Sequence, residues 1–97
     1  MKSIFIAFDQ AYYDQIVALL NMNHVRGFTC WEEVQGRGSK TGEPHYGSHA
    51  WPSLNSSILS VVDDEKVKPI LANLRALDAT SEQMGLRAFV WNVEDGI

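Results

Sequence analysis

Residues 3–22, SIFIAFDQAYYDQIVALLNM, predict a strand that leads directly into a helix. Residues 3–8 are rich in β-branched and aromatic side chains, which favour extended structure, and Asp9 is a suitable N-cap for the segment that follows. Over residues 12–22 the apolar side chains recur every three or four positions, which is typical of a helix with one buried face. This stretch is therefore interpreted as a β-α unit.

Three more strands are expected downstream, and the first two of them form a hairpin across a long loop. They fall at residues 28–34, 56–62 and 86–93. Each is a short run rich in β-branched, aromatic or other apolar residues, bounded by polar residues or glycine.

A second helix is expected between the third and fourth strands. Its regular part starts near residues 65–68, so that Pro69 lies in the first turn, where a proline is tolerated. Asp63 and Asp64 are the expected caps. The apolar residues of this segment have helical spacing and are Val67, Ile70, Leu71, Leu74 and Leu77.

The order β-α-β-β-α-β predicts one α+β domain over residues 1–97. Right-handed crossovers give the ferredoxin-like arrangement, a four-stranded antiparallel sheet with two helices on one face. Aromatic residues such as Trp31 or Trp91 would then lie on the other face, where exposure to water is unfavourable by roughly 25 cal/mol per Å². Self-association that covers this face is therefore expected.

Composition excludes several classes of protein. The 97 residues include eight basic and twelve acidic ones, a net charge of −4, so general binding to nucleic acid is not expected. No apolar run approaches the ~20 residues of a membrane span, and the apolar stretch near the start is too short for a signal peptide. The single cysteine excludes an intrachain disulfide and suits a reducing compartment, so a cytoplasmic location is expected.

The loop at about residues 36–55 is the first place to look for a binding site. It is rich in glycine, contains Pro44 and Pro52, and has no helical or strand period, and long loops of this kind are usually functional. Residues 35–42 combine two cations with three glycines, whose backbone N–H groups can approach an anion closely. This composition suits a phosphate or carboxylate, and the alternative is a flexible, solubilising loop.

Four residues could also hold a metal ion. His45 and His49 lie four positions apart in the loop, with Glu43 beside them and Cys30 on the preceding strand, a donor set that suits zinc or copper. The alternative is a pair of solvated loop histidines and an inert strand cysteine.

No pattern in the sequence supports catalysis, so the protein is expected not to be an enzyme. Glu32 and Glu33 are neighbours in a predicted strand, so their side chains point to opposite faces and cannot form a carboxylate pair. No nucleophile elbow or positioned base accompanies the serines and histidines. The three tryptophans are assigned to a core or subunit interface rather than to stacking on a base.

Five segments spread along nearly the whole chain resemble the PII signal-transduction family, the nitrogen regulatory proteins. They are AYYDQIVALL (11–20), VRGFT (25–29), VQGRG (34–38), VVDD (61–64) and LRAFV (86–90). The first two are similar to the family's first helix and the strand start that follows it, and the third is similar to the V-K-G-x-G entrance of its T-loop. The last two resemble the end of its third strand and the start of its fourth.

The resemblance implies a homotrimer with a nucleotide-binding cleft between each pair of subunits. It also implies a T-loop that controls a partner protein, such as an enzyme or a membrane transporter. The residues implied at the effector cleft are Thr29, Gly36, Arg37, Gly38 and Arg87. Those implied at the partner-binding loop are Lys40, Glu43, His45, Tyr46 and His49. Asn55 stands where the family has a lysine, and the effector is left open between ATP, ADP, AMP, another small anion and a divalent metal.

A second hypothesis is a metal-binding trimer of the divalent-cation tolerance type, which has the same architecture. In this case His45, His49, Glu43 and Cys30 would bind zinc or copper, and the loop would become ordered on binding.

Overall fold

The computed structural model describes residues 1–38, 44–48, 53–81 and 85–97, and its elements follow the predicted order. The strands are β1 (Lys2–Asp9), β2 (Thr29–Val34), β3 (Asn55–Val62) and β4 (Arg87–Asn92). The helices are α1 (Tyr13–Met22) and α2 (Val67–Asp78), each preceded by one 3-10 turn, η1 (Gln10–Tyr12) and η2 (Asp64–Lys66). The predicted element types are confirmed, with boundaries that differ by one or two residues.

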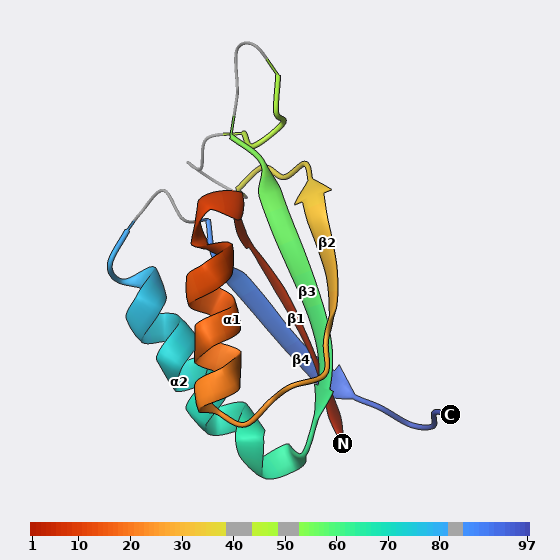
Figure 1. Cartoon of the computed structure of the whole chain (residues 1–97). Helices are drawn as coiled ribbons and strands as arrows, with labels where there is room; N and C mark the ends of the chain where they lie inside the picture. The colour runs from red at the N-terminus through yellow and green to blue at the C-terminus, as the bar shows by residue number, and fades with distance from the viewer. Residues whose placement is uncertain (39–43, 49–52, 82–84) are drawn as a thin grey trace.

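The four strands form one antiparallel sheet in the order β2-β3-β1-β4, so β2 and β4 are its edges. Both helices lie on the same face of this sheet (Figure 1), as the β-α-β-β-α-β order predicts. The described parts of the loop between β2 and β3 lie beyond one end of the sheet (Figure 1). The start of α1 and the start of β4 lie at that same end (Figure 1).

The core lies between the helices and the face of the sheet that they cover, here called the covered face. Ile4, Ile6 and Phe8 alternate along β1 and are at most 1% exposed, and Ile58 of β3 is fully buried beside them. The helices bury the stripes expected from their spacing, which are Ile16, Leu19 and Leu20 of α1 and Ile70 and Leu74 of α2. The period-2 and period-3.6 patterns therefore meet in one apolar layer.

The opposite face of the sheet, here called the open face, is also apolar. Residues paired across neighbouring strands point to the same face, so the register defines this set. It includes Thr29, Trp31, Phe5, Leu59, Val61, Phe89 and Trp91. Trp31 is 45% exposed, Trp91 is 49% exposed and Phe89 is 60% exposed, so the expected position of Trp31 and Trp91 is confirmed, whereas Trp51 lies outside the described residues.

The two helix starts differ from each other in how they are capped. Asp9 acts as the predicted cap, because its Oδ1 accepts a hydrogen bond from the backbone N–H of Ala11 at 2.9 Å. The capping prediction for the second helix is wrong. Asp63 occupies the cap position but makes no side-chain capping bond, and Asp64 instead pairs with the N-terminal amine of Met1 at 2.9 Å. Met1 lies far away in sequence, which is why local pattern could not predict this contact.

Among the residues that the structure describes, neither helix is long and apolar enough to span a membrane.

Candidate functional site

The base of the long loop is held by short antiparallel pairings that extend the β2–β3 hairpin. Gly36 N–H donates to the carbonyl oxygen of His45 at 3.0 Å, and His45 N–H donates back to Gly36 at 2.6 Å. Further along, Tyr46 forms a bridge with Leu54. The loop is thus structured at its base, which a search for strand periodicity cannot detect because each bridge involves single residues.

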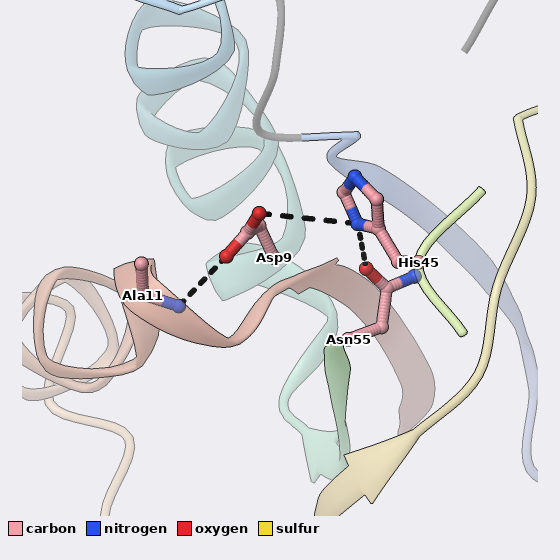
Figure 2. Close-up of polar contacts among 4 residues, drawn as sticks. All are labelled: Asp9, Ala11, His45 and Asn55. Carbon is pink, nitrogen blue, oxygen red and sulfur yellow. Dashed lines mark hydrogen bonds and ion pairs between the residues drawn. The ribbon is translucent and has the colours of Figure 1, made fainter. Parts of the chain in front are cut away.

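His45 is the buried residue of this loop base. The residue is 7% exposed, and its Nδ1 lies 2.6 Å from Asn55 Oδ1. Because an amide oxygen only accepts hydrogen bonds, Nδ1 carries the hydrogen and donates. The same Nδ1 lies 3.9 Å from Oδ2 of Asp9, as Figure 2 shows. His45 is therefore not the solvated loop histidine that one sequence interpretation expected.

The neighbours of His45 come from segments far apart in the sequence. Asp9 ends β1 and caps η1, so its carboxylate bridges the start of the first helix and the His45 ring (Figure 2). Gly36 packs over Asn55, and a Cβ added to it would lie only 2.3 Å from Asn55 Nδ2. A side chain at position 36 would therefore displace the Asn55 amide. Gly85, with φ +60°, faces the ring from the segment before β4, where an added Cβ would lie 3.6 Å from His45 Cε1.

The residues predicted for the effector cleft do not converge within one chain. Thr29 lies on β2 and Arg87 on β4, and both point to the open face from opposite edges of the sheet. The three strand spacings between those edges amount to about 14 Å. Arg37 and Gly38 are exposed at the loop base. Arg87 is also exposed, and its Nη1 donates to the carbonyl oxygen of Leu86 at 2.7 Å.

Cys30 lies on the covered side of β2, packed against the core. Its thiol contacts the hydroxyl of Tyr13 on α1, and burial raises the pKa of both groups, for Cys30 against an opposing effect of the Tyr13 hydrogen bond. A raised pKa disfavours the thiolate that would bind a metal. Within the described parts of the chain, no group of three or more His, Cys, Asp or Glu side chains could hold a metal ion. The metal hypothesis gains no support from these residues.

Three of the predicted loop contacts, Lys40, Glu43 and His49, lie outside the described residues. Tyr46 is described and half-buried, and its carbonyl oxygen accepts a hydrogen bond from Gln35 Nε2 at 3.0 Å. A shallow groove also lies between α2 and β4, and none of the predicted site residues lines it. Its lining residues are Leu71, Leu74, Arg75, Asp78, Leu86 and Ala88.

Sequence reasoning did not connect Asp9 and Asn55 to His45. Asp9 was predicted only as a helix cap, and Asn55 only as a replaced lysine. The signal that could have found them is the strand register, because the ends of β1 and β3 pair Asp9 with Asn55. This register depends on long-range pairing and is not visible in local pattern.

The whole chain, residues 1–97, matches the family model described as Nitrogen regulatory protein P-II. No curated protein sequence matches the chain.

Among solved structures the chain is similar to CPII, a nitrogen regulatory PII-like protein from Thiomonas intermedia K12. One CPII structure, bound to ADP, AMP and bicarbonate, has a TM-score of 0.75 at 23% identity, covering 93% of this chain and 82% of that one. The apo form of CPII has a TM-score of 0.70 at 20% identity, with 93% and 85% covered. A PII-like signaling protein from Thermus thermophilus has a TM-score of 0.67 at 21% identity, with 95% and 85% covered. These similarities establish the fold.

Proposed function

Because this chain belongs to the nitrogen regulatory protein P-II family, we propose that it is a homotrimeric regulatory protein. In this proposal a small effector binds in clefts between subunits and shifts the loop between β2 and β3, the T-loop of the family, which in turn controls a partner protein. An effector changes the loop only through contacts that differ between two loop states.

The observation that carries the proposal is the apolar open face with charged and polar residues at its edges. Trp31, Phe89 and Trp91 are each about half exposed in a single chain, more apolar surface than a single-copy protein usually leaves in contact with water. Since Thr29 and Arg87 lie on opposite edges of that face, two copies lying side by side would bring Thr29 of one copy next to Arg87 of the other. Self-association would therefore cover the face and complete the cleft together.

The proposed effector is an adenine nucleotide or another small anion. Gly36 and Gly38 would present backbone N–H groups to it, and Arg37 and Arg87 would supply positive charge. Thr29 would contact it from the neighbouring copy. Support comes from the exposed positions of the two arginines and from the similar CPII, whose structure contains ADP, AMP and bicarbonate.

The proposed output is regulation of a partner protein rather than catalysis. Lys40, Glu43, Tyr46 and His49 are the loop residues proposed to contact the partner, which we expect to be an enzyme or a membrane transporter. The proposal rests on membership of the family and on the position of the loop, whose described parts lie beyond the end of the sheet (Figure 1).

Calorimetric titration with ATP, ADP, AMP and bicarbonate tests the cleft, together with the mass of the protein in solution. We expect three copies and measurable binding of at least one of these ligands. Replacing Arg87 with glutamine should weaken binding roughly 10- to 100-fold, since a charged hydrogen bond contributes about 1.5–3 kcal/mol. Arg75→Gln is the matched control, because Arg75 is exposed on α2, on the helix side of the sheet. A single protomer, or no heat with any of the four ligands, would contradict the proposal.

A further inference from the structure

We propose that His45 is a positioning residue that locks the base of the T-loop to the sheet and so prepares the Gly36–Arg37–Gly38 segment for its effector. The inference rests on the proposed function and adds to it a residue of this chain that regulates the same site. It departs from the sequence hypotheses, which assigned His45 to partner binding or to a metal.

The first step is the burial and bonding of the imidazole. His45 is 7% exposed although it belongs to a loop, and its Nδ1–H donates to Asn55 Oδ1 at 2.6 Å. A buried polar group of this kind is costly to leave without its partner. The loop base therefore has a preferred position, the one in which the ring and the Asn55 amide meet.

The second step is the range of segments that meet at the ring. Asn55 belongs to the start of β3, Asp9 to the end of β1, and Gly85 to the approach to β4. Figure 2 shows Asp9 between the ring and Ala11, so that one carboxylate faces both the loop and the first helical turn. Asp9 is the charged group that the described contacts place against His45. The ring is thus hydrogen-bonded to the start of β3 and lies close to the end of β1 and to the segment before β4.

The third step links this anchor to the effector segment. His45 and Gly36 exchange two backbone hydrogen bonds, and Gly36 also packs directly over the Asn55 side chain. Arg37 and Gly38 follow immediately in the chain. Fixing the backbone of a residue costs conformational entropy, so a segment already held in place binds a ligand more tightly than a free one. His45 would supply this order before the effector arrives.

The test compares His45→Phe, which keeps a ring of similar size without a donor, with His45→Gln, which can still donate to Asn55. The readouts are effector affinity by calorimetry with ADP and AMP, and hydrogen exchange of the Gly36 and His45 amides. We expect His45→Phe to weaken binding roughly 3- to 10-fold, the equivalent of one hydrogen bond of about 0.5–1.5 kcal/mol. Both amides should exchange faster, while the amide of Ile58 in the core is unchanged. His45→Gln should restore most of the affinity and the protection.

A second pair of variants tests the same hydrogen bond by changing its acceptor, Asn55. Asn55→Ala removes the oxygen, whereas Asn55→Asp keeps one for the Nδ1–H, so only the first should reproduce the loss. His24→Asn is the control for replacing a histidine, because His24 lies between α1 and β2 and has φ +60°, which asparagine also adopts readily.

The outcomes separate the two proposals. Wild-type affinity and unchanged exchange in both His45→Phe and Asn55→Ala would overturn the positioning role. Equal losses in His45→Phe and His45→Gln would also overturn it, since ring packing rather than the hydrogen bond would then be responsible. Wild-type protein that binds none of the ligands would overturn the proposed function instead, and the exchange data alone would then decide whether His45 holds the loop.

Discussion

The two faces of the sheet are both apolar, but within the described parts of the chain only one of them is covered. On the covered face Ile6 and Phe8 have no exposed surface, because α1 and α2 pack over them. On the open face Phe89 and Trp91 are each at least 49% exposed. The difference shows that the chain encodes two apolar layers and supplies the partner elements for one.

Strand β1 carries this difference in its own alternation. Ile4, Ile6 and Phe8 point to the helices, whereas Phe5 and Ala7 point to the open face. A strand of a two-layer domain with one face in water normally alternates apolar with polar residues, and strands covered on both faces are apolar throughout. Apart from Ser3, which also points to the open face, the middle of β1 therefore has the pattern of a strand that is covered on both faces.

The largest expected effect comes from the covered face. Replacing Phe8 with alanine should lower the free energy of unfolding by about 3–5 kcal/mol, because it leaves a cavity in a fully packed layer. Urea denaturation at several protein concentrations measures this, and the loss should not depend on concentration. Phe5→Ala is the matched control on the same strand, since Phe5 is half-buried and points to the open face. If Phe8→Ala and Phe5→Ala lowered the free energy of unfolding of the dissociated protein equally, the covered face would not be the better packed of the two.

A smaller effect is expected on the open face, and it should appear in assembly rather than in folding. Phe89→Ser removes a side chain that is 60% exposed in one chain, so a single copy should lose little stability. Full burial of such a side chain between copies contributes roughly 1.5–3 kcal/mol, so the variant should dissociate at concentrations where the wild type stays assembled. Light scattering over a dilution series measures the mass.

The control for this variant is Met22→Ser. Met22 is 74% exposed at the end of α1, away from the open face, so its loss should leave the mass unchanged. If Phe89→Ser kept the wild-type mass at every dilution, the open face would not be the surface through which copies associate.

Periodicity was sufficient to predict the fold because each element buries one face. The spacing of Ile16, Leu19 and Leu20 predicts α1, and the β-branched and aromatic run in β1 predicts the central strand. The position of Trp31 and Trp91 on the open face follows from strand alternation and is confirmed. Such predictions succeed because they need only residues close together in sequence.

The loop base could not be predicted in the same way. Asp9, His45 and Asn55 come from three separate segments, and their meeting depends on the register of β1 against β3. The irregular pairing between Trp31 and Val34 also shifts the end of β2, and a local pattern does not reveal it. Histidine and asparagine in a glycine-rich loop therefore look solvated in the sequence, although the fold buries the histidine.

The smallest expected effect concerns an ion pair rather than apolar packing, the pair between Asp64 and the Met1 amine at the turn before α2. The Met1 amine, by hydrogen bonding and by its charge, holds the Asp64 pKa below its usual value of about 3.9. A lowered pKa in the folded state means that the carboxylate stabilises the fold above about pH 4, and that this contribution is lost as the pH falls through the folded pKa.

Asp64→Asn should therefore lower the thermal midpoint slightly near pH 5–6, and the difference from wild type should disappear toward pH 2. Differential scanning calorimetry across this range measures it. Asp63→Asn is the matched control, because it removes the same charge one residue away, where the side chain makes no capping bond. Since both partners of the Asp64 pair are well exposed, water and salt screen it strongly. A loss of thermal midpoint as large as that of Phe8→Ala would contradict this expectation. It would mean that the ion pair holds the turn before α2, and that apolar packing on the covered face contributes less than its burial implies.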